Sequence, residues 1–72
     1  MPGPKYTPGR RVEVLAFDFE TPGFPEVWMP GTVTVADLMD SGRWRVLITR
    51  DDGHRFRQIV GTRGGNKRIR AL

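Results

Sequence analysis

Residues 43–60 read RWRVLITRDDGHRFRQIV, and this stretch decides the fold. Apolar residues alternate with polar ones on both sides of the central DDG, which predicts two β-strands joined by a tight hairpin. The loop 51–53 has the composition of a type I turn in which Gly53 takes the left-handed conformation. Pairing Arg50 with His54 sets a register in which the large apolar side chains meet on the inner face. The inner pairs are then Ile48 with Phe56, Val46 with Gln58, and Trp44 with Val60.

The same register brings arginines together on the outer face of the hairpin. Like charges on neighbouring strands cost stability, so such a cluster indicates an anionic partner, with a solvated face as the alternative. The glycine-rich segment 61–66 and the cations around it offer further contacts to an anion, or form a plain turn. Both features favour binding to nucleic-acid phosphates. The predicted contacts are Arg43, Arg45, Arg50, Arg55, Arg57, Arg63, Lys67 and Arg68.

Alternation with a period of two continues outside the hairpin and predicts three more strands. The second of them is expected to hold Met29, Val33 and Val35 on one face, and the last to pack Ile69. Five short strands predict an all-β fold, a small five-stranded bent-sheet barrel closed on itself. The additional strands are predicted at 10–17, about 28–35 and 67–72, with a long loop over 18–27 and a connector over 36–42 that has room for one helical turn. A flexible lead-in, residues 1–9, precedes the single domain, residues 10–72.

The chain has 72 residues, no cysteine and a single histidine, His54. A domain of this size buries a thin core and leaves no deep enzyme cleft. No nucleophile and histidine are arranged as a catalytic pair, and the adjacent Asp51 and Asp52 are assigned to turn geometry rather than to a metal site. The composition therefore favours a non-catalytic binding module, with no catalytic residue, no metal and no cofactor.

The charge is divided unevenly along the chain. The net charge is +4, made up of −3 over residues 1–42 and +7 over residues 43–72. A basic half of this kind suggests a polyanionic or acidic partner. No apolar run reaches the roughly 18–20 residues that a membrane span needs, and no secretory signal is recognisable. We expect an intracellular protein, in the cytoplasm or with the nucleoid or nucleus.

The predicted first loop combines aromatic and acidic residues, which suits a peptide or a cationic ligand. Exposed aromatic side chains in a loop are unusual, although such a loop can also fold back over one end of a barrel. The candidates for peptide binding or stacking are Phe17, Phe19, Phe24 and Trp28, and the carboxylates among them are Asp18, Glu20 and Glu26.

A series of short motifs runs through residues 9–70. They are Gly9, Val12-Glu13-Val14, Trp28-x-Pro30-Gly31-x-Val33, Asp51-Asp52-Gly53 and Ile69-Arg70. This series resembles the agenet and Tudor-like group of small barrels, which are similar to the Src-homology and KOW types. The resemblance implies a five-stranded bent sheet and a binding role, often for methylated lysine or arginine in an aromatic cage. The family's usual cage positions correspond here to Thr49 and Asp52, so the aromatic rings would have to come from around the first loop.

Three interpretations remain open at this point. The first is a module that binds the backbone of DNA or RNA through the basic hairpin, with Phe19 or Phe24 stacking on a base. The second is a protein-interaction module in which the aromatic and acidic loop takes a peptide or a methylated or cationic tail. The third is a subunit of a small homo-oligomer, since a thin barrel gains core by association.

Overall fold

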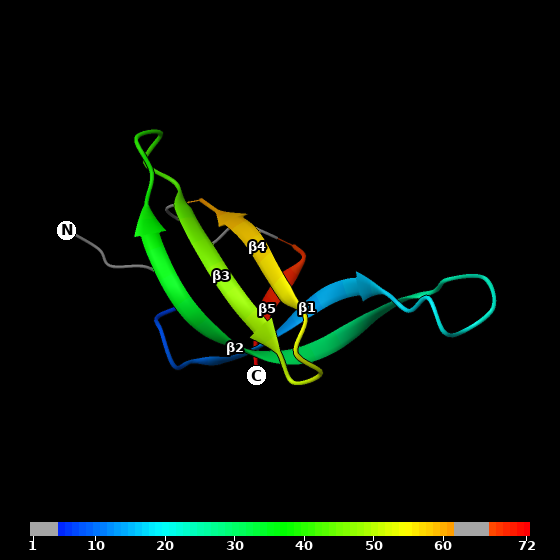
Figure 1. Ribbon diagram of the computed structural model, residues 1–72. Helices are drawn as coiled ribbons and strands as arrows, with labels where there is room; N and C mark the ends of the chain where they lie inside the picture. The colour runs from blue at the N-terminus through cyan, green and yellow to red at the C-terminus, as the bar shows by residue number, and fades with distance from the viewer. Residues whose placement is uncertain (1–4, 62–66) are drawn as a thin grey trace.

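The computed structural model describes residues 5–61 and 67–72 of the chain. Within these ranges the chain forms one antiparallel sheet, with the strands in the order β4-β3-β2-β1-β5 (Figure 1). The strands are β1 (Arg11–Phe17), β2 (Glu26–Leu38), β3 (Trp44–Arg50), β4 (Arg55–Val60) and β5 (Ile69–Ala71). This confirms the prediction of an all-β protein with five strands. No helix in the described ranges is long and apolar enough to cross a membrane.

The β3–β4 hairpin has the predicted loop and register. The Arg50 amide donates to the His54 carbonyl at 2.7 Å, and the Gly53 amide donates to the Arg50 carbonyl at 2.9 Å. Gly53 has a φ of 93°, the left-handed conformation that this turn requires. The pairs Trp44–Val60, Val46–Gln58 and Ile48–Phe56 all form as the alternation predicts.

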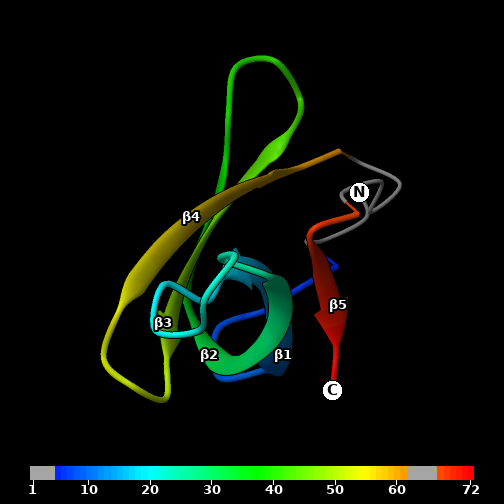
Figure 2. The same cartoon turned by 90° about the vertical axis from the view of Figure 1, so that its right-hand side faces the viewer.

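The prediction of a closed barrel is wrong with respect to hydrogen bonding. Within the described residues, β4 pairs only with β3 and β5 pairs only with β1, so these two outer strands of the sheet are not joined to each other. Figure 2 shows β4 and β5 as separate edges of a strongly curved sheet. β5 has three residues, and this short length limits the ladder that it can offer to a second neighbour.

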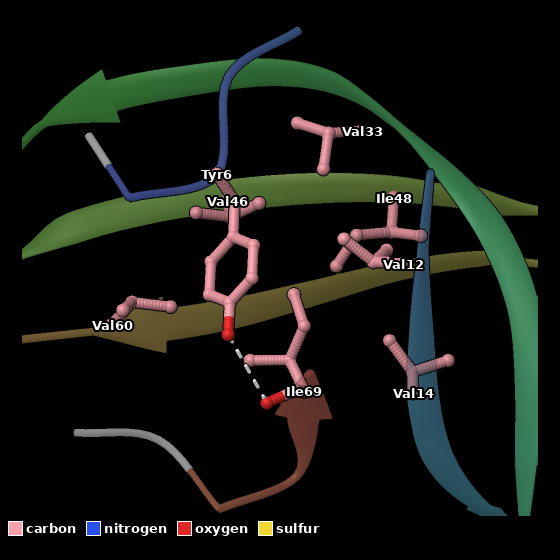
Figure 3. Close-up of a cluster of buried hydrophobic side chains, with 8 residues drawn as sticks. All are labelled: Tyr6, Val12, Val14, Val33, Val46, Ile48, Val60 and Ile69. Carbon is pink, nitrogen blue, oxygen red and sulfur yellow. Dashed lines mark hydrogen bonds between the residues drawn. The ribbon is translucent and has the colours of Figure 1, made fainter. Parts of the chain in front are cut away.

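Tyr6 fills the interior beside this opening. The side chain comes from the segment before β1, is 2% exposed, and lies between Val60 of β4 and Ile69 of β5 (Figure 3). Its hydroxyl donates to the Ile69 carbonyl at 3.4 Å. The Tyr6 side chain thus fills the core at the place where β4 and β5 are not joined by hydrogen bonds. Trp44 and Phe56 are half-buried and pack against this cluster. The other buried residues of the cluster are Val12, Val14, Val33, Val46, Ile48, Val60 and Ile69.

β2 is longer and less regular than the sequence predicts. It continues to Leu38, so residues 36–38 are strand, and the turn after it contains no helical residue. The register with β3 shifts between Val33 and Val35, where Thr34 forms a β-bulge. The bulge reverses the alternation, so Val35 lies opposite the outward-facing Leu47 and not on the face of Val33. The prediction for Val35 is therefore wrong.

The paired ends of β1 and β2 project from the rest of the sheet. Figure 1 shows this hairpin extending to one side and ending in the loop of residues 18–25, and the molecule measures 44 × 20 × 19 Å as a result. The pairs Phe17–Glu26 and Ala16–Val27 hold the projection together next to the loop. The residues at its end are consequently open to solvent.

Candidate functional site

Three phenylalanines gather at the end of the projecting β1–β2 hairpin, and we call Phe17, Phe19 and Phe24 the aromatic tip. Their exposed fractions are 48%, 72% and 55%. The ring centroids of Phe17 and Phe19 are 6.1 Å apart, and those of Phe19 and Phe24 are 5.4 Å apart. These are contact distances for tilted aromatic pairs. Three of the four predicted aromatic site residues thus form one exposed cluster.

The loop that presents the aromatic tip is held by local hydrogen bonds. The Asp18 carboxylate accepts the Glu20 amide at 3.0 Å and the Thr21 hydroxyl at 2.6 Å. The hydrogen bond from Thr21 and then that from Glu20 lower the pKa of Asp18. Phe24 has a φ of 49°, and its amide donates to the Thr21 carbonyl at 3.1 Å. The loop therefore has a defined conformation, in which the bulky Phe24 occupies the left-handed region.

A cavity of about 780 Å³ separates this hairpin from the β3–β4 hairpin. One side is made by the end of β1 and the start of the loop, and the other by inward-facing residues of β4 and its turn. The cavity therefore lies between the inner face of β4 and the end of β1. The lining residues are Leu15, Ala16, Phe17, Asp18, Phe19, Glu20, Met29, Arg50, Asp52, His54, Phe56, Gln58 and Arg68.

Arg50 belongs to the wall of this cavity and not to the basic outer face. It is 7% exposed, and its guanidinium group lies 4.9 Å from the centre of the Phe56 ring. The guanidinium forms a bidentate ion pair with Asp52, with Nε 2.9 Å from Oδ1, and its Nη2 lies 2.8 Å from Nδ1 of His54. The hydrogen bond from Arg50 lowers the pKa of Asp52 from 3.8 to about 2. Arg50 is one of the predicted phosphate contacts, and the structure places it on the inner face because even-numbered residues of β3 face inward.

Trp28, the fourth predicted aromatic site residue, packs against a guanidinium group of the protein itself. The Arg70 guanidinium lies 3.9 Å from the centre of the Trp28 ring, and Arg70 Nε donates to Glu13 at 3.0 Å. Glu13 and Arg70 are paired neighbours of β1 and β5. This face of the indole is therefore occupied by a cation of the protein itself, and Trp28 does not line the cavity.

The predicted phosphate contacts fall into two groups. Three of them are paired with carboxylates: Arg50 with Asp52, Arg45 with Asp37 at 2.8 Å, and Arg68 with Glu26 at 3.2 Å. Of the residues that the structure describes, Arg43, Arg55, Arg57 and Lys67 are exposed and form no salt bridge. Arg63 lies outside the described residues.

Arg55 and Arg57 border a second hollow, of about 500 Å³, on the outer face of the sheet. The bulge at Thr34 turns Val35 toward this face, where Leu47 also lies. The hollow combines an apolar floor with two unpaired guanidinium groups. Its lining residues are Thr34, Val35, Leu47, Ile48, Thr49, Arg55, Phe56 and Arg57.

Two features of the structure around the hairpins are not predicted from the sequence. The turn residue Asp51 pairs with Arg11 at 2.6 Å and 2.7 Å, and the hydrogen bonds from Arg11 lower the pKa of Asp51. The cavity brings together segments separated by up to some fifty positions in the chain, such as Leu15 and Arg68, whose guanidinium donates to the Leu15 carbonyl at 3.2 Å.

Comparison with models of protein families, with curated proteins and with solved structures finds no match for this chain.

Proposed function

We propose that the protein is a non-catalytic binding module that takes a peptide segment with a cationic side chain between its two hairpins. The observation that carries this proposal is the aromatic tip, three exposed phenyl rings of which Phe19 contacts the other two, and of which Phe17 and Phe19 line a cavity of about 780 Å³. Exposed apolar clusters beside a hollow are typical of binding sites. The resemblance to agenet and Tudor-like barrels supports this cavity as the binding site, because Asp52, at one of the family's cage positions, lines it.

The backbone of the loop supports a functional role for the aromatic tip. A bulky residue at positive φ costs about 1–3 kcal/mol relative to a relaxed conformation. Phe24 has a φ of 49° and yet leaves 55% of its surface exposed, so burial of its ring within the protein recovers only part of this cost. A strained and exposed aromatic residue is accounted for if its ring meets a partner.

The charges around the aromatic tip favour a cationic ligand. Asp18 and Glu20 line the cavity, and residues 17–27 contain neither lysine nor arginine. Two arginines also line the cavity, and each is paired with a carboxylate: Arg50 on the facing hairpin with Asp52, and Arg68 with Glu26. A cation placed between the phenyl rings and the carboxylates of Asp18 and Glu20 would gain both cation–π and ion-pair contacts.

Selection from a displayed library of short random peptides tests this function. We expect the wild-type protein to enrich peptides that contain lysine or arginine next to an apolar residue. The double variant Phe19→Ala/Phe24→Ala should lose at least about tenfold in affinity for the selected peptides, because stacking surface and the cation–π contact are both removed. Isothermal titration calorimetry on purified protein measures this loss.

A matched control uses apolar residues exposed elsewhere. Leu38 and Met39, at the end of β2, are 53% and 37% exposed and do not line the cavity. Leu38→Ala/Met39→Ala should bind the selected peptides like the wild type. Equal losses in both double variants would show that binding depends on general surface hydrophobicity, and the proposed site would then be wrong.

A second candidate function is contact with nucleic-acid backbone through the outer face of the β3–β4 hairpin. It is favoured by Arg43, Arg55 and Arg57, which are exposed and form no salt bridge in the described part of the chain. Under this function a single-stranded oligonucleotide is retarded in a gel at low salt, and retardation disappears in Arg55→Gln/Arg57→Gln. The Phe19→Ala/Phe24→Ala protein retards the oligonucleotide as strongly as the wild type does, unless a base stacks on the aromatic tip. A gel without retardation at low salt removes this candidate.

A further inference from the structure

Two residues of β4, Arg55 and Arg57, direct backbone groups away from β3 and toward no other described strand. The hydrogen bond from Arg50 to His54 at the neck of the hairpin fixes which pairs of the ladder are bonded. Bonded and non-bonded pairs alternate in an antiparallel ladder, so Ile48–Phe56 is bonded and Thr49–Arg55 and Leu47–Arg57 are not. The N–H and C=O groups of Arg55 and Arg57 therefore point away from β3. Among the described strands, β3 is the only partner of β4.

The two faces of this edge have different chemistry. On the outer face, Arg55 and Arg57 are exposed and form no salt bridge with any described carboxylate. On the inner face, His54, Phe56 and Gln58 line the cavity beside the aromatic tip. A chain that lies along β4 would thus have the cavity on one side and two guanidinium groups on the other.

We propose that the partner segment binds as an additional β-strand at the edge of β4 formed by Arg55 and Arg57, with acidic residues at alternate positions opposite these two arginines. This inference rests on the proposed function, because it states how the segment in the cavity lies. Side chains of an added strand alternate between the two faces of the sheet. The residues that point inward enter the cavity toward the aromatic tip, and the residues that point outward meet the arginines.

Charge complementarity selects this occupant. Directly opposite residues of paired strands have Cβ atoms about 4.5–5.5 Å apart, which is close enough for an ion pair. Carboxylates two positions apart in the segment would therefore meet Arg55 and Arg57 together. In the free protein the same two charges discourage pairing between identical edges, because a second copy would bring arginine against arginine. The segment is consequently an acidic strand of another protein and not a second copy of β4.

Two displayed libraries test the side-chain pattern. In one library glutamate alternates with random residues, and in the other lysine takes the place of glutamate. We expect the wild type to enrich the glutamate library more strongly than the lysine library, and we expect Arg55→Gln/Arg57→Gln to weaken the selected peptides by at least about tenfold. Lys5→Gln/Arg10→Gln, which removes the same charge from residues before β1, should bind normally. Equal or stronger enrichment of the lysine library, or equal losses in both double variants, would overturn the proposal.

N-methylation of a selected peptide tests the backbone contact. A strand at an edge bonds through every second amide only. Methylating that set should abolish binding, and methylating the other set should leave it intact; equal sensitivity of both sets would overturn strand addition. If the methylation pattern alternates but Phe19→Ala/Phe24→Ala binds normally, the edge contact holds and the proposed function fails. An oligonucleotide that displaces the peptide and needs the same two arginines would assign them to phosphate and overturn the inference.

Discussion

Replacement of Tyr6 by alanine is expected to destabilise the protein by about 3–5 kcal/mol, the usual cost of removing a buried aromatic side chain. Tyr6 is 2% exposed and lies between β4 and β5, where no backbone ladder joins the two edges. A small domain has a free energy of unfolding of about 5–15 kcal/mol, so the loss is a substantial part of the stability. Thermal unfolding followed by circular dichroism should show a fall in Tm of more than about 12 °C.

The matched control is Tyr6→Phe. The hydroxyl makes one long hydrogen bond, 3.4 Å to the Ile69 carbonyl, and its loss should cost about 1 kcal/mol or less. A Tyr6→Ala protein that melts within a few degrees of the wild type would contradict the account of the core, because the segment before β1 would then contribute nothing to it.

Substitution of Gly31 by alanine should destabilise the sheet by about 1–3 kcal/mol through overpacking. Gly31 is buried within β2 and pairs with Val12 of β1 on one side and Arg50 of β3 on the other. A Cβ atom there would lie 2.8 Å from the Thr49 carbonyl oxygen and 3.1 Å from Cα of Arg50. These are backbone atoms of a central strand, which cannot move without disturbing the ladder.

Gly61→Ala serves as the control for this prediction. A Cβ atom at Gly61 meets no atom of the residues that the structure describes within 4 Å, and Gly61 does not have the positive φ that favours glycine. Urea denaturation of the two variants should show a lower midpoint for Gly31→Ala and an unchanged midpoint for Gly61→Ala. Two equal midpoints would mean that β2 and β3 are not as closely apposed at Gly31 as the structure has them.

The sequence is sufficient to predict the β3–β4 hairpin because everything that determines it is local. The alternation of residues 44–60 sets the inner and outer faces, and Gly53 sets the turn and therefore the register. The bulge at Thr34 is different, because nothing in the run from Thr32 to Val35 distinguishes a bulged strand from a regular one. A single inserted position then reverses the face of every later residue of β2.

Closure of the sheet depends on contacts between segments that are distant in the chain. Alternation predicts that strands exist, but it contains no information on whether β4 reaches β5. Tyr6 occupies the interior at that place, and it comes from a segment rich in proline and glycine that has no periodicity. A single buried side chain in an irregular segment leaves no pattern to detect.

Only one wall of the candidate site could be predicted from the sequence. Phe19 and Phe24 stand out in the sequence because aromatic residues between prolines and acidic residues are unusual in a loop. The facing wall does not stand out, since Arg50 looks like one more arginine at the end of a basic strand. Its burial follows from its parity in β3 together with the carboxylate of Asp52, two positions later in the turn.

The most direct measurement of the central claim is a ¹⁵N–¹H NMR titration of the wild-type protein with a peptide selected from the random library. The account predicts that amide shifts change at Phe17, Phe19 and Phe24, and at the residues of β4 that line the cavity. Arg43 and the outer end of the β2–β3 turn should not respond. Shift changes confined to the outer face, with an unperturbed aromatic tip, would contradict the account.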